Sequence, residues 1–218
     1  MAETQTRPKI AAPAGACDAH MHFYTNAEFP PLPNKASPDG AWVEDYREVQ
    51  KALGLERVVA VQPTAYGRDN SCQLTAMAAF GDKARGVMVV DETTPEAELE
   101  RLTRLGVRGA RFHILPGGAV PWEIIEEVAA RVHAFGWHIQ LQLNGRELPE
   151  REAVLKRLPG TLVVDHVGRF TPPVAVDDPA FKVLLRFLEG GRCWVKLSAP
   201  YESSSAGGPG FADVRPEA

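Results

Sequence analysis

The sequence predicts an α/β fold, a (β/α)8 TIM barrel that is incomplete because its eighth strand is missing. Short apolar runs alternate with segments of helical periodicity, which is typical of parallel strands joined by helices. None of the seven runs is followed by a Gly-rich phosphate loop, so an open doubly wound sheet is disfavoured. The run 137–144 has one polar and one apolar face, which suits a barrel strand better than a strand covered by helices on both sides.

The expected elements follow one another along the chain. Strands are expected at 17–22, 57–63, 86–90, 107–113, 137–144, 161–166 and 193–198. Helices are expected at 42–53, 70–80, 94–105, 121–135, 149–158 and 178–188, each from apolar side chains at helical spacing. Pro95 and Pro179 lie in first turns, and glycines follow most of the helices as C-terminal stops. We expect 15–218 to form one barrel domain after a disordered tail at 1–14.

The first expected strand carries the most distinctive pattern. Alternation of side chains puts His20 and His22 on one face, with Asp18 behind them. The three apolar side chains of this strand point the other way and are expected to pack under a helix. Two imidazoles at a strand end are typical of a barrel strand that ends in a site. The alternative is a surface pair on an edge strand.

Composition limits the class of protein. The chain has 44% hydrophobic and 24% charged residues and a net charge of −4, as in a soluble globular domain that binds neither nucleic acid nor membrane. No apolar run is long enough to span a bilayer. The three cysteines Cys17, Cys72 and Cys193 are widely spaced and form no disulfide or metal-binding pattern, so a cytoplasmic location is expected.

Polar side chains collect where the expected strands end, which is where barrel enzymes carry their active sites. Imidazoles, cations and amides together predict a polar site that accepts an anion. Arg111 suits a substrate carboxylate because its guanidinium is planar, or else it braces a loop. Lys196 either joins this site or forms a buried pair with Asp165 or Asp18. The collected residues are His20, His22, Gln62, Thr64, Asp91, Arg111, His113, Gln142, Asn144, His166, Lys196 and Ser198.

Four motifs occur in a fixed order in the chain. They are His20-Met21-His22, then Gln62-Pro63 with Tyr66-Gly67 and Asp69-Asn70, then Gly109-Ala110-Arg111-Phe112, and finally Val164-Asp165-His166-Val167-Gly168-Arg169. Together they resemble the amidohydrolase superfamily, over about residues 15–205. Within it they resemble the branch that contains 2-pyrone-4,6-dicarboxylate lactonases and D-galactarolactone isomerases.

The resemblance implies a distorted TIM barrel that hydrolyses or isomerises a small anionic lactone. It implies catalytic roles for His20, His22 and His166, and a carboxylate-binding role for Arg111. We expect the rest of the substrate site to comprise Gln62, Tyr66, Asn70, Lys196 and Ser198. No metal is expected in this branch. Many superfamily members bind zinc through the first motif, so a zinc-dependent hydrolase or decarboxylase with His20 and His22 as ligands stays the alternative.

Two departures from the branch bear on these expectations. The lactonases carry a second arginine after the fourth strand, where this chain has Ile114-Leu115-Pro116-Gly117-Gly118, so a pyrone dicarboxylate is not a secure substrate. Their eighth strand ends in a catalytic aspartate, whereas this chain stops at Ala218 before that strand. We therefore expect a truncated chain, with an inactive remnant as a further alternative. Its exposed sheet edges predict association, either into a specific homo-oligomer or by aggregation.

Overall fold

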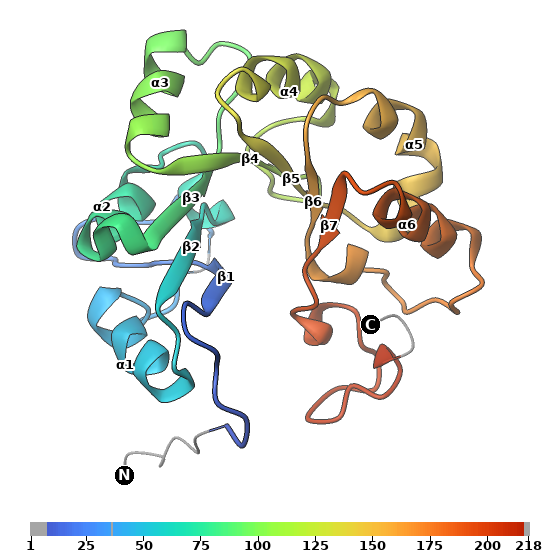
Figure 1. Cartoon of the computed structure of the whole chain (residues 1–218), viewed down its shortest axis with the longest axis horizontal. Helices are drawn as coiled ribbons and strands as arrows, with labels where there is room; N and C mark the ends of the chain where they lie inside the picture. Colours follow the sequence, from blue (N-terminus) through green and yellow to red (C-terminus); the bar gives the residue numbers. More distant parts are fainter. Residues whose placement is uncertain (1–7, 36, 216–218) are drawn as a thin grey trace. The chain divides into compact units, whose positions relative to one another are not determined.

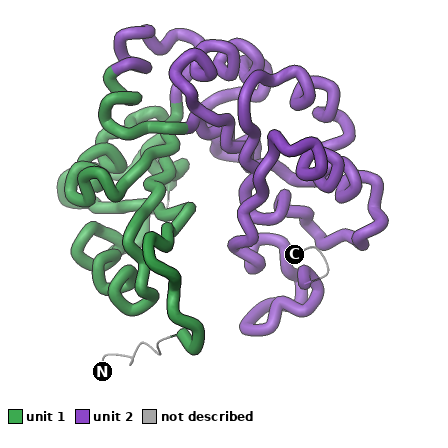
Figure 2. Tube along the Cα trace, viewed as in Figure 1, with its two compact units in different colours: residues 1–89, 101–108 green, residues 90–100, 109–218 purple. Residues whose placement is uncertain are grey.

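The computed structural model describes residues 8–35 and 37–215, and these residues hold seven strands that pair in parallel and alternate with helices (Figure 1). The fold class is therefore α/β, and the predicted incomplete (β/α) barrel is confirmed. Contacts along the chain divide it into two compact units, coloured separately in Figure 2. Unit 1 comprises 1–89 and 101–108, and unit 2 comprises 90–100 and 109–218.

Unit 1 contains three strands and the helices that connect them. Its elements are β1 (Cys17–Met21), α1 (Val43–Leu53), β2 (Arg57–Val61), η1 (Thr64–Tyr66), α2 (Ser71–Phe80), η2 (Gly81–Lys83), β3 (Ala84–Met88) and the second half of α3 (Glu96–Arg104). An aromatic cluster fills the core, where the Phe23 ring lies 5.4 Å from Tyr46 and 5.7 Å from Phe80. These contacts fix the chain directly after β1, next to His22.

The expected alternation in β1 is broken by a bulge. Asp18 pairs with Val58 but Met21 pairs with Ala60, so β1 has one residue more than β2 over this stretch. The helix lies on the Asp18 side, where the Tyr46 hydroxyl of α1 donates to Asp18 Oδ2 at 3.0 Å. The expectation that the apolar face of this strand packs under a helix is therefore wrong, and Cys17 and the alanine at 19 are exposed instead.

Unit 2 contains the remaining strands. Its elements are the first half of α3, β4 (Val107–His113) from residue 109 onward, η3 (Trp122–Ile124), α4 (Ile125–His133), β5 (His138–Gln142), η4 (Gly145–Glu147), α5 (Leu148–Arg157), β6 (Leu162–Val164), η5 (His166–Gly168), α6 (Pro179–Glu189), β7 (Cys193–Val195) and η6 (Pro200–Glu202). Parallel ladders join β4 to β5, β5 to β6 and β6 to β7. Helices α5 and α6 pack against each other (Figure 1).

Most expected elements are present, and the differences lie at their ends. The strands at 57–63, 161–166 and 193–198 stop at Val61, Val164 and Val195, although the next residue of each still donates its backbone N–H to a neighbouring strand. The helix at 121–135 begins as the separate 3-10 turn η3. Among the apolar side chains whose helical spacing predicts these helices, Val49, Leu53 and Leu105 are 36%, 41% and 50% exposed; Leu53 is the last residue of α1 and Leu105 follows the end of α3.

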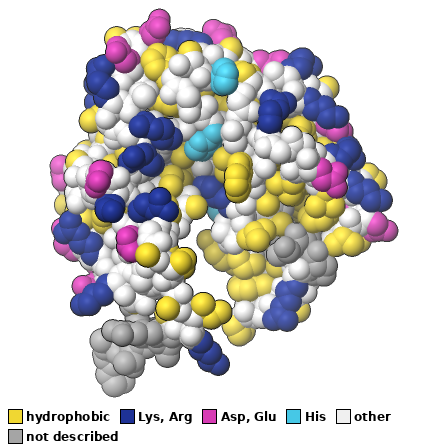
Figure 3. Space-filling model, viewed as in Figure 1, with side chains coloured by type: hydrophobic (Ala, Val, Ile, Leu, Met, Phe, Trp, Pro, Cys, Tyr) yellow, Lys and Arg dark blue, Asp and Glu magenta, His cyan; other side chains and the backbone are white. Residues whose placement is uncertain are grey.

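The surface of the described residues carries both signs of charge. Figure 3 shows Lys and Arg side chains together with Asp and Glu side chains on one face. Within the described residues, no helix has the length and apolar character needed to cross a membrane. The expectations of no nucleic-acid and no membrane partner stay predictions.

Candidate functional site

The unit 1 histidines contact each other as their spacing predicts. His20 Nε2 and His22 Nε2 are 3.2 Å apart, with the rings nearly perpendicular. His22 Nδ1 lies 2.7 Å from the carbonyl oxygen of Val61, which can only accept, so this nitrogen carries the proton. The Asp18 carboxylate receives the backbone N–H of His20 at 2.9 Å and the Tyr46 hydroxyl at 3.0 Å. Val61 of β2 therefore orients the His22 ring, and Tyr46 of α1 orients the Asp18 carboxylate that binds the backbone of His20.

This pair fits half of a zinc site. With its proton on Nδ1, neutral His22 presents a lone pair at Nε2, and a partner carbonyl on the other ring nitrogen is typical of metal-binding histidines. Two imidazole nitrogens on one tetrahedral zinc lie about 3.3 Å apart, close to the 3.2 Å observed. The same distance also suits an N–H···N hydrogen bond from His20 to His22. Bound zinc would act as a Lewis acid held by these two side chains.

The other predicted residues of unit 1 hold loops in place. Gln62 is fully buried, and its amide donates to the carbonyl oxygens of Gly67 and Asp69 at 3.1 and 2.8 Å. Asn70 makes two hydrogen bonds with the backbone of Val89, at 2.8 and 3.0 Å.

Tyr66 shares this bracing role, because its hydroxyl accepts the backbone N–H of Thr25 at 3.2 Å. Burial raises the pKa of Tyr66, so the hydroxyl stays protonated. The observed contacts of Gln62, Tyr66 and Asn70 therefore shape the segments after β1 and β2, and their substrate-binding roles stay predictions.

In unit 2, Gln142 on β5 connects two side chains of β4. Its Oε1 accepts from Arg111 Nη2 at 2.6 Å and lies 3.1 Å from His113 Nδ1. Its Nε2 donates to Glu202 Oε2 at 3.1 Å. Arg111 is only 4% exposed, and burial followed by the Arg111 charge lowers the pKa of His113 to about 4. His113 is therefore neutral at pH 7, and Arg111 is a buried charge at the end of β4.

Lys196 forms the buried pair that was one of its two expected roles. Its Nζ lies 3.5 Å from Asp165 Oδ1 and donates to Gln140 Oε1 at 2.7 Å. The Gln140 amide in turn donates to Asp165 Oδ2 at 3.0 Å. These three side chains come from β5 and from the residues that follow β6 and β7. They form a closed network at the same strand ends as Gln142.

His166 lies at the end of β6, directly after Asp165 of this network. Its Nδ1 lies 2.9 Å from the hydroxyl of Ser198, and its Nε2 lies 4.0 Å from Glu202 Oε1. Arg169 Nε donates to Glu202 Oε2 at 2.6 Å. Of the predicted residues of unit 2, the structure thus brings Arg111, His166 and Ser198 into one chain of contacts through Gln142 and Glu202, with Lys196 on the neighbouring Asp165.

We call these ten side chains the unit 2 polar cluster: Arg111, His113, Gln140, Gln142, Asp165, His166, Arg169, Lys196, Ser198 and Glu202. The cluster has three cations and two carboxylates, so its net charge is +1 with neutral histidines. A cluster of this composition can attract an anion and can stabilise negative charge that develops on a carbonyl oxygen.

Sequence reasoning missed Glu202 altogether. It lies in η6, four positions after Ser198, where strand periodicity no longer applies. Arg169 was quoted in a motif but given no role. The only sequence signal for either residue is a charged side chain shortly after a predicted strand end, and this signal is too common to single them out.

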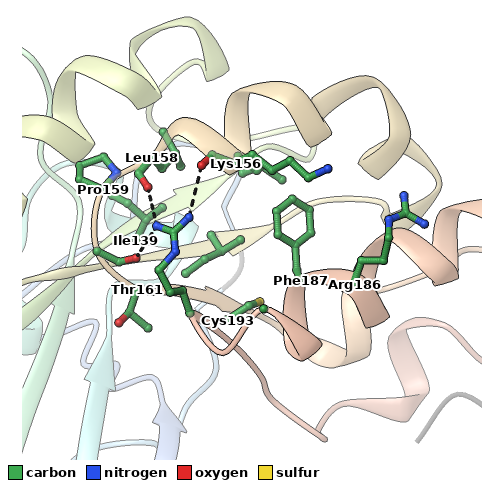
Figure 4. Close-up of a pocket in the computed structure, with 13 residues that line it drawn as sticks. Ile139, Lys156, Leu158, Pro159, Thr161, Arg186, Phe187 and Cys193 are labelled. Atoms are coloured by element: carbon green, nitrogen blue, oxygen red, sulfur yellow. Dashed lines mark hydrogen bonds between the residues drawn. The ribbon is translucent and has the colours of Figure 1, made fainter.

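A separate cavity of about 160 Å³ lies in unit 2 (Figure 4). Its wall includes Ile139, Leu162 and Cys193, which begin or lie near the beginning of β5, β6 and β7. Arg192 borders it and donates to the carbonyl oxygens of residues 156, 158 and 160. Active sites of (β/α) barrels lie at the opposite strand ends, so this cavity is not a candidate for catalysis.

Comparison with known proteins gives a family match, related sequences and a similar solved structure. The Amidohydrolase family profile matches residues 17–217. The chain is 38% identical to D-galactarolactone isomerase of Agrobacterium fabrum over 96% of its own length and 72% of that protein. It is 37% identical to 2-pyrone-4,6-dicarboxylate hydrolase of Comamonas testosteroni, over 93% and 68%. A crystal structure of an Agrobacterium tumefaciens protein superposes with a TM-score of 0.89 at 37% identity, covering 95% of this chain and 76% of that one.

Proposed function

Because the chain belongs to the amidohydrolase family, we propose that it acts on a small lactone that carries a carboxylate, either hydrolysing or isomerising it. The observation that carries this proposal is the unit 2 polar cluster, which combines a net positive charge with an imidazole. The names of two relatives support it, since one is a lactone isomerase and the other a hydrolase of a pyrone dicarboxylate.

In this reaction the cations orient the substrate. We assign the substrate carboxylate to the positive field of Arg111, with Lys196 contributing. Attack on the lactone carbonyl places negative charge on its oxygen, and nearby cations and N–H donors lower the energy of that state. Gln142 holds the Arg111 guanidinium in position through the 2.6 Å hydrogen bond.

His166 is the proposed acid–base residue of unit 2. The Ser198 hydroxyl lies 2.9 Å from its Nδ1 and fixes the ring, and we assign to its Nε2 the proton exchange with water or with the ring oxygen of the lactone. The proposed catalytic roles of His20 and His22 rest on their paired Nε2 atoms, 3.2 Å apart, one of which presents a lone pair.

The test is the variant Arg111→Met, assayed on a γ-butyrolactone that carries one ring carboxylate. Hydrolysis is followed by proton release and isomerisation by NMR. We expect kcat/KM to fall about 100-fold, mostly through KM, because a charge-assisted contact with the substrate is lost. Arg108→Met is the matched control, since Arg108 lies on the same strand, is exposed, and donates to the carbonyl oxygens of Thr103 and Val107. Unchanged kcat/KM in a folded Arg111→Met variant would contradict the clamp.

A zinc-dependent hydrolase or decarboxylase is the second candidate, favoured by the His20–His22 geometry. It requires about one zinc per chain by elemental analysis, lost in His20→Ala, together with activity that disappears on chelation and returns with zinc. We propose the metal-independent reaction, for which activity survives chelation.

We further propose a cytoplasmic location. No disulfide joins the three cysteines in the described part of the chain, and Cys72 and Cys193 are buried thiols. A reducing compartment keeps such thiols intact. Association into a homo-oligomer is proposed as well, and size-exclusion chromatography with light scattering measures it.

A further inference from the structure

Glu202 brings a negative charge into a cluster that otherwise attracts anions. Its carboxylate accepts from Arg169 Nε at 2.6 Å and from Gln142 Nε2 at 3.1 Å, and it lies 4.0 Å from His166 Nε2. The Glu202 side chain is 25% exposed, so a bound molecule can reach it. An acidic residue here touches the arginine, amide and imidazole that would themselves serve an anionic substrate.

The backbone holds Glu202 in this place. Its N–H donates to the carbonyl oxygen of Ala199 at 2.9 Å, within η6. The Thr171 hydroxyl donates to the Glu202 carbonyl oxygen at 3.4 Å, which ties η6 to the segment after Arg169. The carboxylate is therefore a fixed part of the cluster rather than the end of a loose surface side chain.

The two acidic residues of the cluster have different positions. Asp165 is 1% exposed and lies 3.5 Å from the Lys196 ammonium, deep at the end of β6. Glu202 and its partner Arg169 are both partly exposed, with side-chain exposures of 25% and 26%, whereas Gln142 is buried. Each carboxylate has a cation beside it, so exposure is what distinguishes them: a ligand that reaches Arg169 also meets Glu202, whereas Asp165 is out of its reach.

We propose that Glu202 sets substrate choice by charge: the cluster accepts a lactone with one carboxylate and rejects a lactone with a second carboxylate nearby. With a net charge of +1, the cluster can neutralise one substrate carboxylate. A second one would approach Glu202 and be repelled, because like charges within a few ångströms in a partly desolvated site interact strongly. This inference rests on the proposed lactone-directed function and adds the residue that limits the substrate's charge.

The test compares two probes on the wild-type chain and on Glu202→Gln. One probe is a γ-butyrolactone with a single ring carboxylate, and the other is the same ring with two adjacent carboxylates. Dissociation constants are measured by calorimetry, and kcat/KM by proton release. We expect wild type to prefer the monocarboxylate and Glu202→Gln to shift the preference at least about tenfold towards the dicarboxylate. Glutamine keeps the size and an acceptor oxygen for Arg169.

Two further variants test whether a change in preference is due to the charge at position 202. Glu147→Gln removes a unit 2 carboxylate that pairs with Arg151 on α5, and it should leave the preference unchanged. Glu202→Asp keeps the charge and should keep the wild-type preference. Should Glu202→Gln fail to fold, Glu202→Met, which also removes the charge at similar size, is measured in its place with the same expected shift towards the dicarboxylate.

The outcomes distinguish a failure of the proposed lactone-directed function from a failure of the role of Glu202. If wild type binds and turns over neither probe, the proposed function fails and this inference falls with it. If wild type uses the monocarboxylate but folded Glu202→Gln keeps the same ratio, the function stands and the role of Glu202 is refuted.

Discussion

The low pKa of His113 makes the stability of the chain depend on pH in a defined window. Burial, and secondly the Arg111 guanidinium, lower this pKa from 6.5 to about 4. Above pH 6.5 the imidazole is neutral in the folded and unfolded states. Between the two values only the unfolded chain binds the proton, so the free energy of unfolding decreases as the pH falls. At about pH 5 the loss from this residue is about 2 kcal/mol, and below the folded pKa it reaches about 3 kcal/mol.

Urea denaturation of wild type and His113→Asn at about pH 7 and pH 5 measures this loss. Asparagine keeps an N–H donor for Gln142 Oε1, which lies 3.1 Å from the imidazole, but it does not titrate. Carboxylates also titrate on acidification, so the informative quantity is the difference between the two proteins. We expect wild type to lose about 2 kcal/mol more than the variant. Parallel losses would show that the imidazole titrates in the folded protein as it does in the unfolded chain.

Two further predictions concern stability and thiol chemistry. Gly160→Ala should lower the free energy of unfolding by about 1–3 kcal/mol in urea titrations, because φ is +75° and a Cβ would lie 2.8 Å from a ring nitrogen of His133. Gly190→Ala is the control, with its nearest contacts at 3.4 Å, and an equal loss in both variants would refute the argument. With a disulfide reagent near pH 8, the exposed Cys17 should react fast, whereas burial raises the pKa of Cys193 to about 11 and makes it slow. A fast phase that persists in Cys17→Ser would contradict this.

Periodicity predicted the strands and helices well because it reports burial. β4 matches its expected range of 107–113, and the polar face predicted for β5 is the face that carries Gln140 and Gln142. The same logic failed in β1, where the bulge after Asp18 changes which side chains face α1. A bulge adds one residue without altering the pattern of residue types, so alternation alone cannot detect it.

The site was predictable where a side chain follows a strand directly and unpredictable where a turn positions it. Arg111, Gln142 and His166 were found because parallel strands end at one edge of the sheet. The contacts of Glu202 depend on η6, whose course is set by hydrogen bonds such as that from Thr171. Gln62 was assigned to substrate, yet its amide binds two loop carbonyl oxygens, a choice of partner that residue type does not determine.

The turn after β6 shows how backbone strain serves the cluster. Residues 166–169 all have positive φ, of 54°, 54°, 80° and 48°, although only Gly168 adopts such values readily. Each of the other three costs on the order of 1 kcal/mol, most of all Val167 with its branched Cβ. In an extended continuation of β6, His166 and Arg169 would be three positions apart and face opposite sides.

The left-handed turn instead brings both side chains to one carboxylate. Arg169 Nε lies 2.6 Å and His166 Nε2 4.0 Å from the oxygens of Glu202. Hydrogen bonds from Val167 N to Lys196 O and from Arg169 N to His166 O, at 3.0 and 2.8 Å, hold the turn in this form. A strained turn persists only where surrounding contacts outweigh its cost. Here one of those contacts comes from Lys196, directly after β7, so the residues after β6 and β7 are positioned together and present an imidazole, a guanidinium and a carboxylate at the same place.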